Sequence, residues 1–222
     1  IWHDDVTTLP EDAPLLIMAN EFFDALPVYQ LVRRAAHWHE RRVACQDTMF
    51  LPIAGKPVPD DLVPEALRDA VPGSIVESCP AGVAIVRALS KRLATQGGAA
   101  LIIDYGYGGQ VIEKVPLDTL QAVHRGEKVS PFYDPGAHDL TAHVDFSALA
   151  AIAHNRGLAI HGPVAQGALL GELGIAARAE ALRMGKPPHE AGSITAALLR
   201  LTAPQQMGAI FQALAVTAPG RP

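Results

Sequence analysis

Residues 81–104 read AGVAIVRALSKRLATQGGAALIID, and this stretch decides the fold class of the chain. Its first half carries apolar residues close to helical spacing, at Val83, Ile85, Val86, Leu89 and Leu93. Two glycines follow directly, as is common where a helix ends. The continuous apolar run Ala99–Ile103 comes next and is typical of a strand buried on both faces of a parallel sheet. A helix that leads at once into such a strand predicts an α/β fold with a doubly wound sheet.

Three other segments are predicted to be strands. Leu15–Ala19 is a second continuous apolar run, which we also expect to be buried on both faces. Leu158–Ile160 begins a third strand, and Met207–Val216 contains a candidate final strand. Residues 28–58 hold short segments rich in β-forming residues, which predict a small antiparallel excursion from the main sheet.

The second half of the chain is predicted to be rich in helices. Asp145 can cap a helix over Phe146–Arg156 that closes at Gly157. Two further helical stretches, at 169–184 with a break near Gly174 and at 190–201, form a helical insertion around 166–204. The segment between the Ala99–Ile103 strand and Asp145 is expected to be irregular, beginning with a flexible crest at Tyr105–Gly109.

Composition limits the classes of protein that this chain can belong to. It has 222 residues, of which 49% are apolar and 18% charged, so one globular domain is expected. The longest apolar runs have the length of strands, which predicts no membrane span. The formal net charge of −5 argues against a nucleic-acid partner, which requires a basic surface. Cys45 and Cys79 lack zinc-site spacing, which indicates a reducing compartment and no structural metal.

Polar residues follow two of the predicted strands. Residues 20–24 follow the first run, and 104–106 follow the Ala99–Ile103 run. Ligands of open α/β sheets bind beyond the carboxyl ends of the strands, so both segments are expected at one rim. Their carboxylates and amide could hold a cation or a polar edge of a cofactor. Alternatively, Asn20 and Asp24 are turn and cap residues that satisfy local backbone groups.

The segment HDLTAHVD at 138–145 offers a possible metal site, because imidazoles and carboxylates at short spacing can ligate zinc or iron. Its spacing fits no familiar ligand set, and Asp139, Thr141 and Asp145 are all good turn or capping residues. We therefore expect a structured loop that leads into the next helix, and no metal.

Three blocks in the sequence resemble, in order, the signature blocks of the MidA/NDUFAF7-type methyltransferases: ANEFFDALP at 19–27, LIIDYGY at 101–107 and DLTAHVDF at 139–146. The similarity continues through residues 166–175 and 207–211, and it therefore runs nearly from end to end. The resemblance implies a class I (Rossmann-like) S-adenosylmethionine-dependent methyltransferase with a mixed seven-stranded sheet whose last strand is antiparallel. The whole chain would be the C-terminal portion of one such domain.

The same resemblance implies a function, a cofactor and a partner. The protein would transfer a methyl group from S-adenosyl-L-methionine to an arginine of a protein substrate, possibly a subunit of NADH dehydrogenase (complex I) during its assembly. It would act in the bacterial cytoplasm, or in the mitochondrial matrix of a eukaryote. Neither a nucleic acid nor a membrane span is expected.

The resemblance also suggests roles for individual residues, which are expectations at this point. The expected catalytic residues are Glu21 and Asp24, and the expected cofactor-binding residues are Asn20 and Phe22. The expected substrate-binding residues are Asp104, Tyr105, Asp139 and Thr141. Glu21 follows its strand as the first glutamate does in the loop of protein arginine methyltransferases. A second glutamate stands nine positions later in that loop, and here that position is Gln30, so Asp24 is the expected substitute.

The chain departs from the family pattern at its beginning. The first strand and the acidic Gly-x-Gly loop, which would hold part of the cofactor, have no counterpart in it, and a start without Met leads us to expect residues upstream. Two other classes of protein remain as alternatives. One is a methyltransferase-like assembly scaffold without activity. The other is a dinucleotide-dependent oxidoreductase, which would require a glycine-rich turn that the sequence does not contain.

Overall fold

The computed structural model describes residues 1–108, 118–124 and 127–219. The chain divides into two compact units, the first formed by residues 1–23, 85–109 and 144–222, and the second by residues 24–84 and 110–143. That both belong to one methyltransferase domain stays a prediction. Within the described ranges, no helix is long and apolar enough to cross a membrane.

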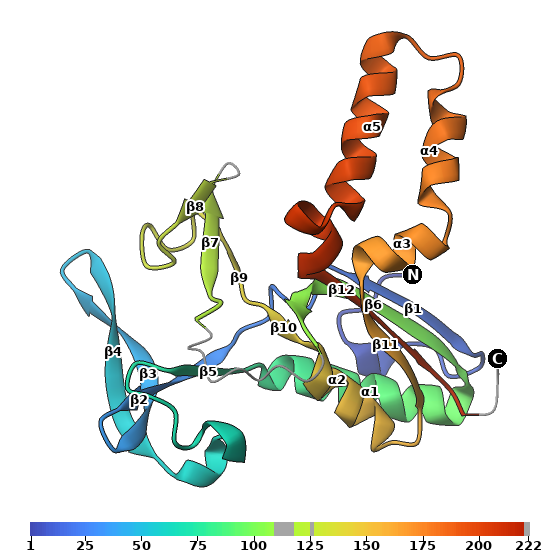
Figure 1. Ribbon diagram of the computed structural model, residues 1–222. Coiled ribbons are helices and arrows are strands. Elements are labelled where there is room, and N and C mark those ends of the chain that lie inside the picture. Colours follow the sequence, from blue (N-terminus) through green and yellow to red (C-terminus); the bar gives the residue numbers. More distant parts are fainter. Residues whose placement is uncertain (109–117, 125–126, 220–222) are drawn as a thin grey trace. The chain divides into compact units, whose positions relative to one another are not determined.

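A mixed sheet forms the centre of the first unit (Figure 1). Its strands lie in the order β1 (Leu15–Asn20), β6 (Gly98–Tyr107), β12 (Phe211–Thr217) and β11 (Ala159–Ala165), and the short β10 (Val144–Asp145) also pairs with β6. β1 runs parallel to β6, whereas β12 is antiparallel to both of its neighbours. The predicted α/β fold, with a mixed sheet whose last strand is antiparallel, is therefore confirmed.

β1 and β6 approach each other very closely where their pairing begins. Leu15 is the partner of Gly98, and a Cβ atom on Gly98 would lie 1.9 Å from the carbonyl oxygen of Leu15. Gly98 also has a φ of +112°, which a residue with a side chain rarely adopts. Only glycine therefore permits this register, which fixes where the two strands end.

The prediction that β1 is buried on both faces is wrong. Its residues alternate between half-buried and exposed, with Leu16 86% and Met18 72% exposed. The continuous apolar run indicated two covered faces, but among the described residues only one face of β1 is covered.

Helices accompany this sheet; some lie against it, whereas the last two pack against each other and extend away from it (Figure 1). They are α1 (Pro80–Gln96), α2 (Phe146–His154), α3 (Gln166–Glu172), α4 (Ile175–Arg183) and α5 (Pro188–Thr202), with the short helical turns η1 (Val6–Thr8) and η4 (Pro204–Gly208). As predicted, Asp145 caps α2 by accepting a hydrogen bond of 3.0 Å from the backbone N–H of Ala148. Gly174, with a φ of 78°, separates α3 from α4 at the predicted break. η4 precedes β12, whose bounds confirm the candidate final strand predicted within Met207–Val216.

The second unit contains a four-stranded antiparallel sheet in the order β4 (Met49–Val58), β3 (His37–Gln46), β2 (Tyr29–Arg34) and β5 (Ile75–Ser78). This confirms the extended segments predicted over 28–58. One face of the sheet packs into a small core around the fully buried Trp38, whose indole N–H donates to the carbonyl oxygen of Arg68 at 3.2 Å. Two short turns, η2 (Asp60–Leu62) and η3 (Glu65–Leu67), lie in the segment that follows β4.

A three-stranded sheet forms where irregular chain was expected. It has the order β8 (Glu127–Val129), β7 (Gln121–His124) and β9 (Asp139–Thr141). The expectation of a flexible crest from Tyr105 onward is also wrong as far as Tyr107, because β6 continues to that residue and pairs there with β10. Gly109, the end of the expected crest, lies outside the described residues.

Candidate functional site

The carboxyl ends of β1 and β6 meet at one rim of the first unit's sheet. Because the strands are parallel, Asn20 lies opposite Ile103, and the backbone N–H of Glu21 donates to the carbonyl oxygen of Ile103 at 3.0 Å. The predicted convergence of Glu21 and Asp104 on the same rim is therefore confirmed.

Asp104 fixes the backbone of the loop that follows β1. Its side chain is fully buried, and Oδ2 accepts hydrogen bonds from the N–H groups of Phe22 (3.1 Å) and Phe23 (2.9 Å). Oδ1 accepts a third, of 2.9 Å, from the N–H of Tyr105. A buried carboxylate is stable only when its oxygens are hydrogen-bonded, so the loop and Asp104 depend on each other. Asp104 thus holds the rim in place, and direct contact with a substrate stays a prediction.

The side chains at the tip of this loop are exposed. Glu21 is exposed and has a φ of 47°, a left-handed backbone that is uncommon for a residue with a side chain. The amide of Asn20 lies 3.4 Å from the carboxylate of Glu21. Such strained positions often mark functional sites, and the two bonds to Asp104 next to Glu21 can offset the strain. A carboxylate, an amide and the 44%-exposed ring of Phe22 are therefore presented together.

Tyr105 supports the rim from the second strand. Its half-buried ring lies 4.1 Å, centroid to centroid, from the ring of Phe211 on β12. Phe23, at the other end of the loop, is buried and packs edge-on against Phe22 at 5.2 Å. The five predicted residues from 20–22 and 104–105 are thus gathered at one rim.

The other three predicted residues belong to the second unit. The carbonyl oxygen of Asp24 accepts a hydrogen bond of 3.0 Å from the N–H of Ala142, which places Asp24 beside the end of β9. Thr141 is the last residue of that strand, and Asp139, which is exposed, is its first. Asp24 is only 5% exposed. The catalytic role of Asp24 and the substrate contacts of Asp139 and Thr141 stay predictions.

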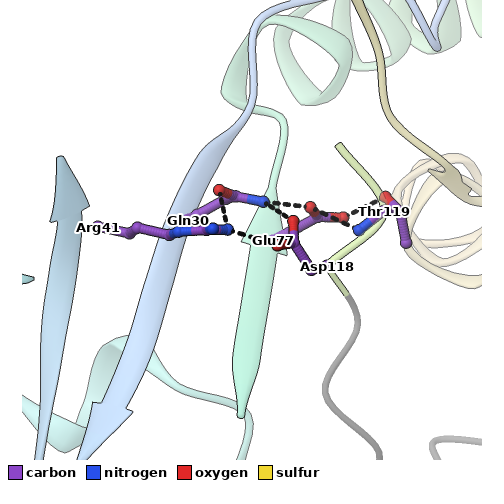
Figure 2. A network of polar contacts seen from close by, with 5 residues as sticks. All are labelled: Gln30, Arg41, Glu77, Asp118 and Thr119. Atoms are coloured by element: carbon purple, nitrogen blue, oxygen red, sulfur yellow. Dashed lines mark hydrogen bonds and ion pairs between the residues drawn. The ribbon is translucent and has the colours of Figure 1, made fainter. Parts of the chain in front are cut away.

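The sequence reasoning did not find a polar network in the second unit that joins Gln30, Arg41, Glu77, Asp118 and Thr119 (Figure 2). The amide nitrogen of Gln30 donates to Glu77 at 2.6 Å and to Asp118 at 3.0 Å, while its oxygen accepts from Arg41 at 2.9 Å. Gln30 therefore does not act as an exposed equivalent of a second glutamate. Its side chain holds two carboxylates next to each other, and Arg41 partly neutralises them through an ion pair of 2.8 Å with Asp118.

Glu77 links this network to the segment that carries β9. It accepts hydrogen bonds from both the N–H and the hydroxyl of Thr119, and that hydroxyl accepts one of 2.9 Å from the N–H of His143. His143 is half-buried, and burial lowers the pKa of its imidazole. The nearby carboxylate of Glu77 opposes this shift, and the ammonium of Lys128 adds to it. The imidazole is therefore held mainly in its neutral form.

The described part of the chain contains no group of three or more His, Cys, Asp or Glu side chains placed to hold a metal ion. The Nδ1 atom of His138 lies 3.1 Å from that of His124, and the His138 ring stacks on that of Tyr133 at 6.0 Å, centroid to centroid. Asp145 is occupied as a helix cap. The 138–145 segment was expected to be a structured loop; it instead contains β9 and the short β10, and it leads, as expected, into the helix that Asp145 caps.

Comparison with known proteins identifies the family of the chain. A family model described as "Putative S-adenosyl-L-methionine-dependent methyltransferase" matches residues 1–164. The mouse (Mus musculus) "Protein arginine methyltransferase NDUFAF7, mitochondrial" is 34% identical over 221 residues, which cover 97% of this chain and 48% of the mouse protein. The Drosophila melanogaster homologue is 33% identical over 226 residues, covering 97% and 49% of the two chains. The chain thus spans about half the length of these curated relatives.

A solved structure is similar over the same range. The crystal structure of a COG1565 superfamily member from Burkholderia thailandensis, bound to S-adenosyl-homocysteine, matches with a TM-score of 0.81 and 28% sequence identity. The match covers 98% of this chain and 56% of that one.

The role of Asp104 predicts the effect of replacing it with asparagine. Asp104→Asn removes the charge and turns an amide NH2 toward a backbone N–H, so at least one hydrogen bond of the loop is lost. We expect the full-length protein to lose about 2–4 kcal/mol of unfolding free energy in chemical denaturation. Asp12→Asn, at an exposed position, serves as control and should leave stability unchanged. Equal stability of both variants would contradict the role assigned to Asp104.

The lowered pKa of His143 predicts a loss of stability in acid. In the unfolded chain the imidazole takes up a proton near its usual pKa of 6.5, whereas in the folded chain it does so only at lower pH. The unfolded state therefore binds more protons below about pH 6.5, and its formation becomes easier there. Full stability is present above this pH and is lost as the pH falls toward the folded-state pKa.

Unfolding free energies of wild type and His143→Gln, measured between about pH 7.5 and pH 5.5, test this expectation. The variant keeps the backbone N–H that binds Thr119, and its stability should fall less steeply with pH. His37→Gln, an exposed histidine of the same unit, should behave as wild type. Parallel curves for wild type and His143→Gln would show that the imidazole does not contribute.

Proposed function

Because the chain belongs to this family of S-adenosyl-L-methionine-dependent methyltransferases, we propose that the protein that contains it transfers a methyl group from S-adenosyl-L-methionine to an arginine of a protein substrate. The observation that carries the proposal is the rim at the ends of β1 and β6. There Asp104 accepts hydrogen bonds from the backbone of the loop after β1, and Glu21 is exposed. The names of the curated relatives support arginine as the acceptor. A subunit of NADH dehydrogenase is the proposed substrate protein, and the bacterial cytoplasm or the mitochondrial matrix the proposed location.

The residues at the rim fit part of such a cofactor. Asn20 offers an amide that can donate and accept hydrogen bonds, and Phe22 offers an exposed ring face against which a planar base can pack. Asn20 is the last residue of β1 and Phe22 lies in the loop after it, at the sheet edge where ligands of open α/β sheets bind. We assign these two residues to cofactor binding.

Glu21 is the proposed catalytic residue at this rim. When bound, the cofactor supplies a methyl group on a sulfonium that leaves readily, so the main task of the protein is to align the acceptor nitrogen. The Glu21 carboxylate can bind a guanidinium through charge-assisted hydrogen bonds and orient it. One proton must leave the nitrogen that receives the methyl group, and an exposed carboxylate gives it a path to solvent.

The remaining predicted residues have supporting roles in this proposal. Asp104 and Tyr105 hold the shape of the rim, the first through three backbone hydrogen bonds and the second by packing on Phe211. Asp24, Asp139 and Thr141 are proposed to contact the substrate from the segment around β9, with Asp24 as a second carboxylate for the guanidinium.

Replacing Glu21 by glutamine in the full-length protein tests the proposal. Glu21→Gln keeps the size of the side chain and removes its charge, so an arginine acceptor is no longer held in line. We expect the rate of methyl transfer to an arginine-containing substrate to fall by about a hundredfold. Glu172→Gln, an exposed glutamate on α3, is the matched control and should retain full activity.

Two results would contradict the proposal in different ways. Unchanged turnover of Glu21→Gln would remove this residue from the mechanism. If calorimetry detected no binding of S-adenosyl-L-methionine by the wild-type full-length protein, the assembly-scaffold alternative would replace the enzyme.

A further inference from the structure

The four-stranded sheet of the second unit has a second face, opposite to the one that packs on its core. Leu31 and its partner Val76 pack on the Trp38 core. Side chains alternate across a strand, so Val32 and its partner Ile75 point to the opposite face. We call this opposite face the outer face; the register also places on it Gln30, Arg34, Arg41 and Glu77. The network of Figure 2 therefore lies on the outer face.

Two hollows adjoin each other on the outer face. One, of about 500 Å³, is lined by residues that include Gln30, Val43, Leu120 and Phe132. The other, of about 550 Å³, is lined by residues that include Val32, Arg34 and Ile75. Arg41, Pro52 and Ile53 line both, so the two hollows form one continuous groove with Arg41 in its middle. We call this the outer groove.

The second hollow is positively charged. Three arginines line it, Arg33, Arg34 and Arg41, and none of its lining residues is acidic. Arg41 is neutralised by Asp118. Arg34 is exposed, and within the described residues neither it nor Arg33 forms a salt bridge. Arg33 pairs with Trp38 and therefore points to the core face, where its Nε is buried without a hydrogen-bond partner in the described structure and its guanidinium lies 6.0 Å from the centre of the Trp38 ring. Among the described residues, Arg34 is thus the free cation of this hollow.

The lining of this groove favours a ligand that combines carboxylates with apolar groups. A guanidinium can bind a carboxylate through two parallel hydrogen bonds, and the lining between the arginines is apolar, with Val32, Ile53 and Ile75. An extended peptide alternates its side chains, so it can place acidic and apolar groups in such a groove in turn. A net charge of −5 for the chain as a whole disfavours a nucleic acid, which gains most of its affinity from many basic residues.

We propose that the outer groove binds an extended acidic segment of the protein substrate, with Arg34 as the carboxylate-binding residue. That the bound protein is also the methyl acceptor rests on the proposed function, whereas binding of an acidic peptide does not. The groove would add affinity and selectivity for a substrate through residues other than those assigned to methyl transfer.

Binding of labelled peptides to the full-length protein, followed by fluorescence anisotropy, tests the groove directly. The probe is a short peptide in which glutamate and leucine alternate, and its control has glutamine in place of each glutamate. We expect the acidic peptide to bind more tightly than the control, and more weakly as salt is added. Arg34→Gln should weaken its binding about tenfold, and Arg34→Lys, which keeps the charge, should weaken it less.

Lys56→Gln is the matched control variant. Lys56 is an exposed cation on β4 of the same sheet and lines neither hollow, so its loss should leave peptide binding unchanged. Equal affinity of wild type and Arg34→Gln, equal losses in Arg34→Gln and Lys56→Gln, or equal binding of both peptides would overturn the proposal. Tighter binding of a single-stranded oligonucleotide than of the acidic peptide would overturn it as well.

Methyl transfer separates failure of the groove from failure of the proposed function. With the substrate protein, Arg34→Gln should raise KM and leave kcat unchanged, because it removes binding that is equal in the ground and transition states. Peptide binding by a protein that transfers no methyl group would leave the groove in place and reject the enzyme.

Discussion

A single buried carboxylate organises the rim of the first unit. Asp104 has no exposed surface, and three backbone N–H groups that donate to it offset the cost of burying a charge there. Two of these donors belong to the loop after β1, and the third to β6 itself. The carboxylate therefore ties the ends of two strands together. Glu21 owes its exposed and left-handed position to this constraint, because the residues that follow it cannot move away.

The pairing of strands in the sheet determines where Asp104 and the loop after β1 lie. The parallel pairing of β1 with β6 aligns their carboxyl ends, and the contact of Gly98 with Leu15 sets the register. The second unit uses a different arrangement, in which Trp38 and its neighbours cover one face of an antiparallel sheet. Polar and basic residues on its outer face then remain available for the network around Glu77 and for the outer groove.

Local patterns in the sequence predicted most of the main elements. Continuous apolar runs located β1 and β6, Asp145 identified the start of α2, and Gly174 marked the break between two helices. The same local reasoning missed β7, β8 and β9, because strands of three or four residues carry no clear periodicity and depend on distant partners.

The candidate site could be predicted only in part for a similar reason. Strand ends could be read from the sequence, so Glu21 and Asp104 were expected at one rim. Two of the three N–H donors to Asp104 belong to residues about eighty positions away, a contact that no spacing indicates. The network that joins Gln30, Glu77 and Asp118 is equally non-local, with partners 47 and 88 residues apart. Nothing in the sequence around Gln30 indicates that its side chain bridges two carboxylates.

The central claim is that the loop after β1 is held by the Asp104 carboxylate. Amide hydrogen exchange of Phe22 and Phe23 in the full-length protein, measured by NMR, tests this claim most directly. The account predicts that both amides exchange as slowly as those of the paired strand β6, although they lie in a loop. Exchange at the rate of an unprotected surface loop would contradict it, since the two hydrogen bonds would then not persist in solution.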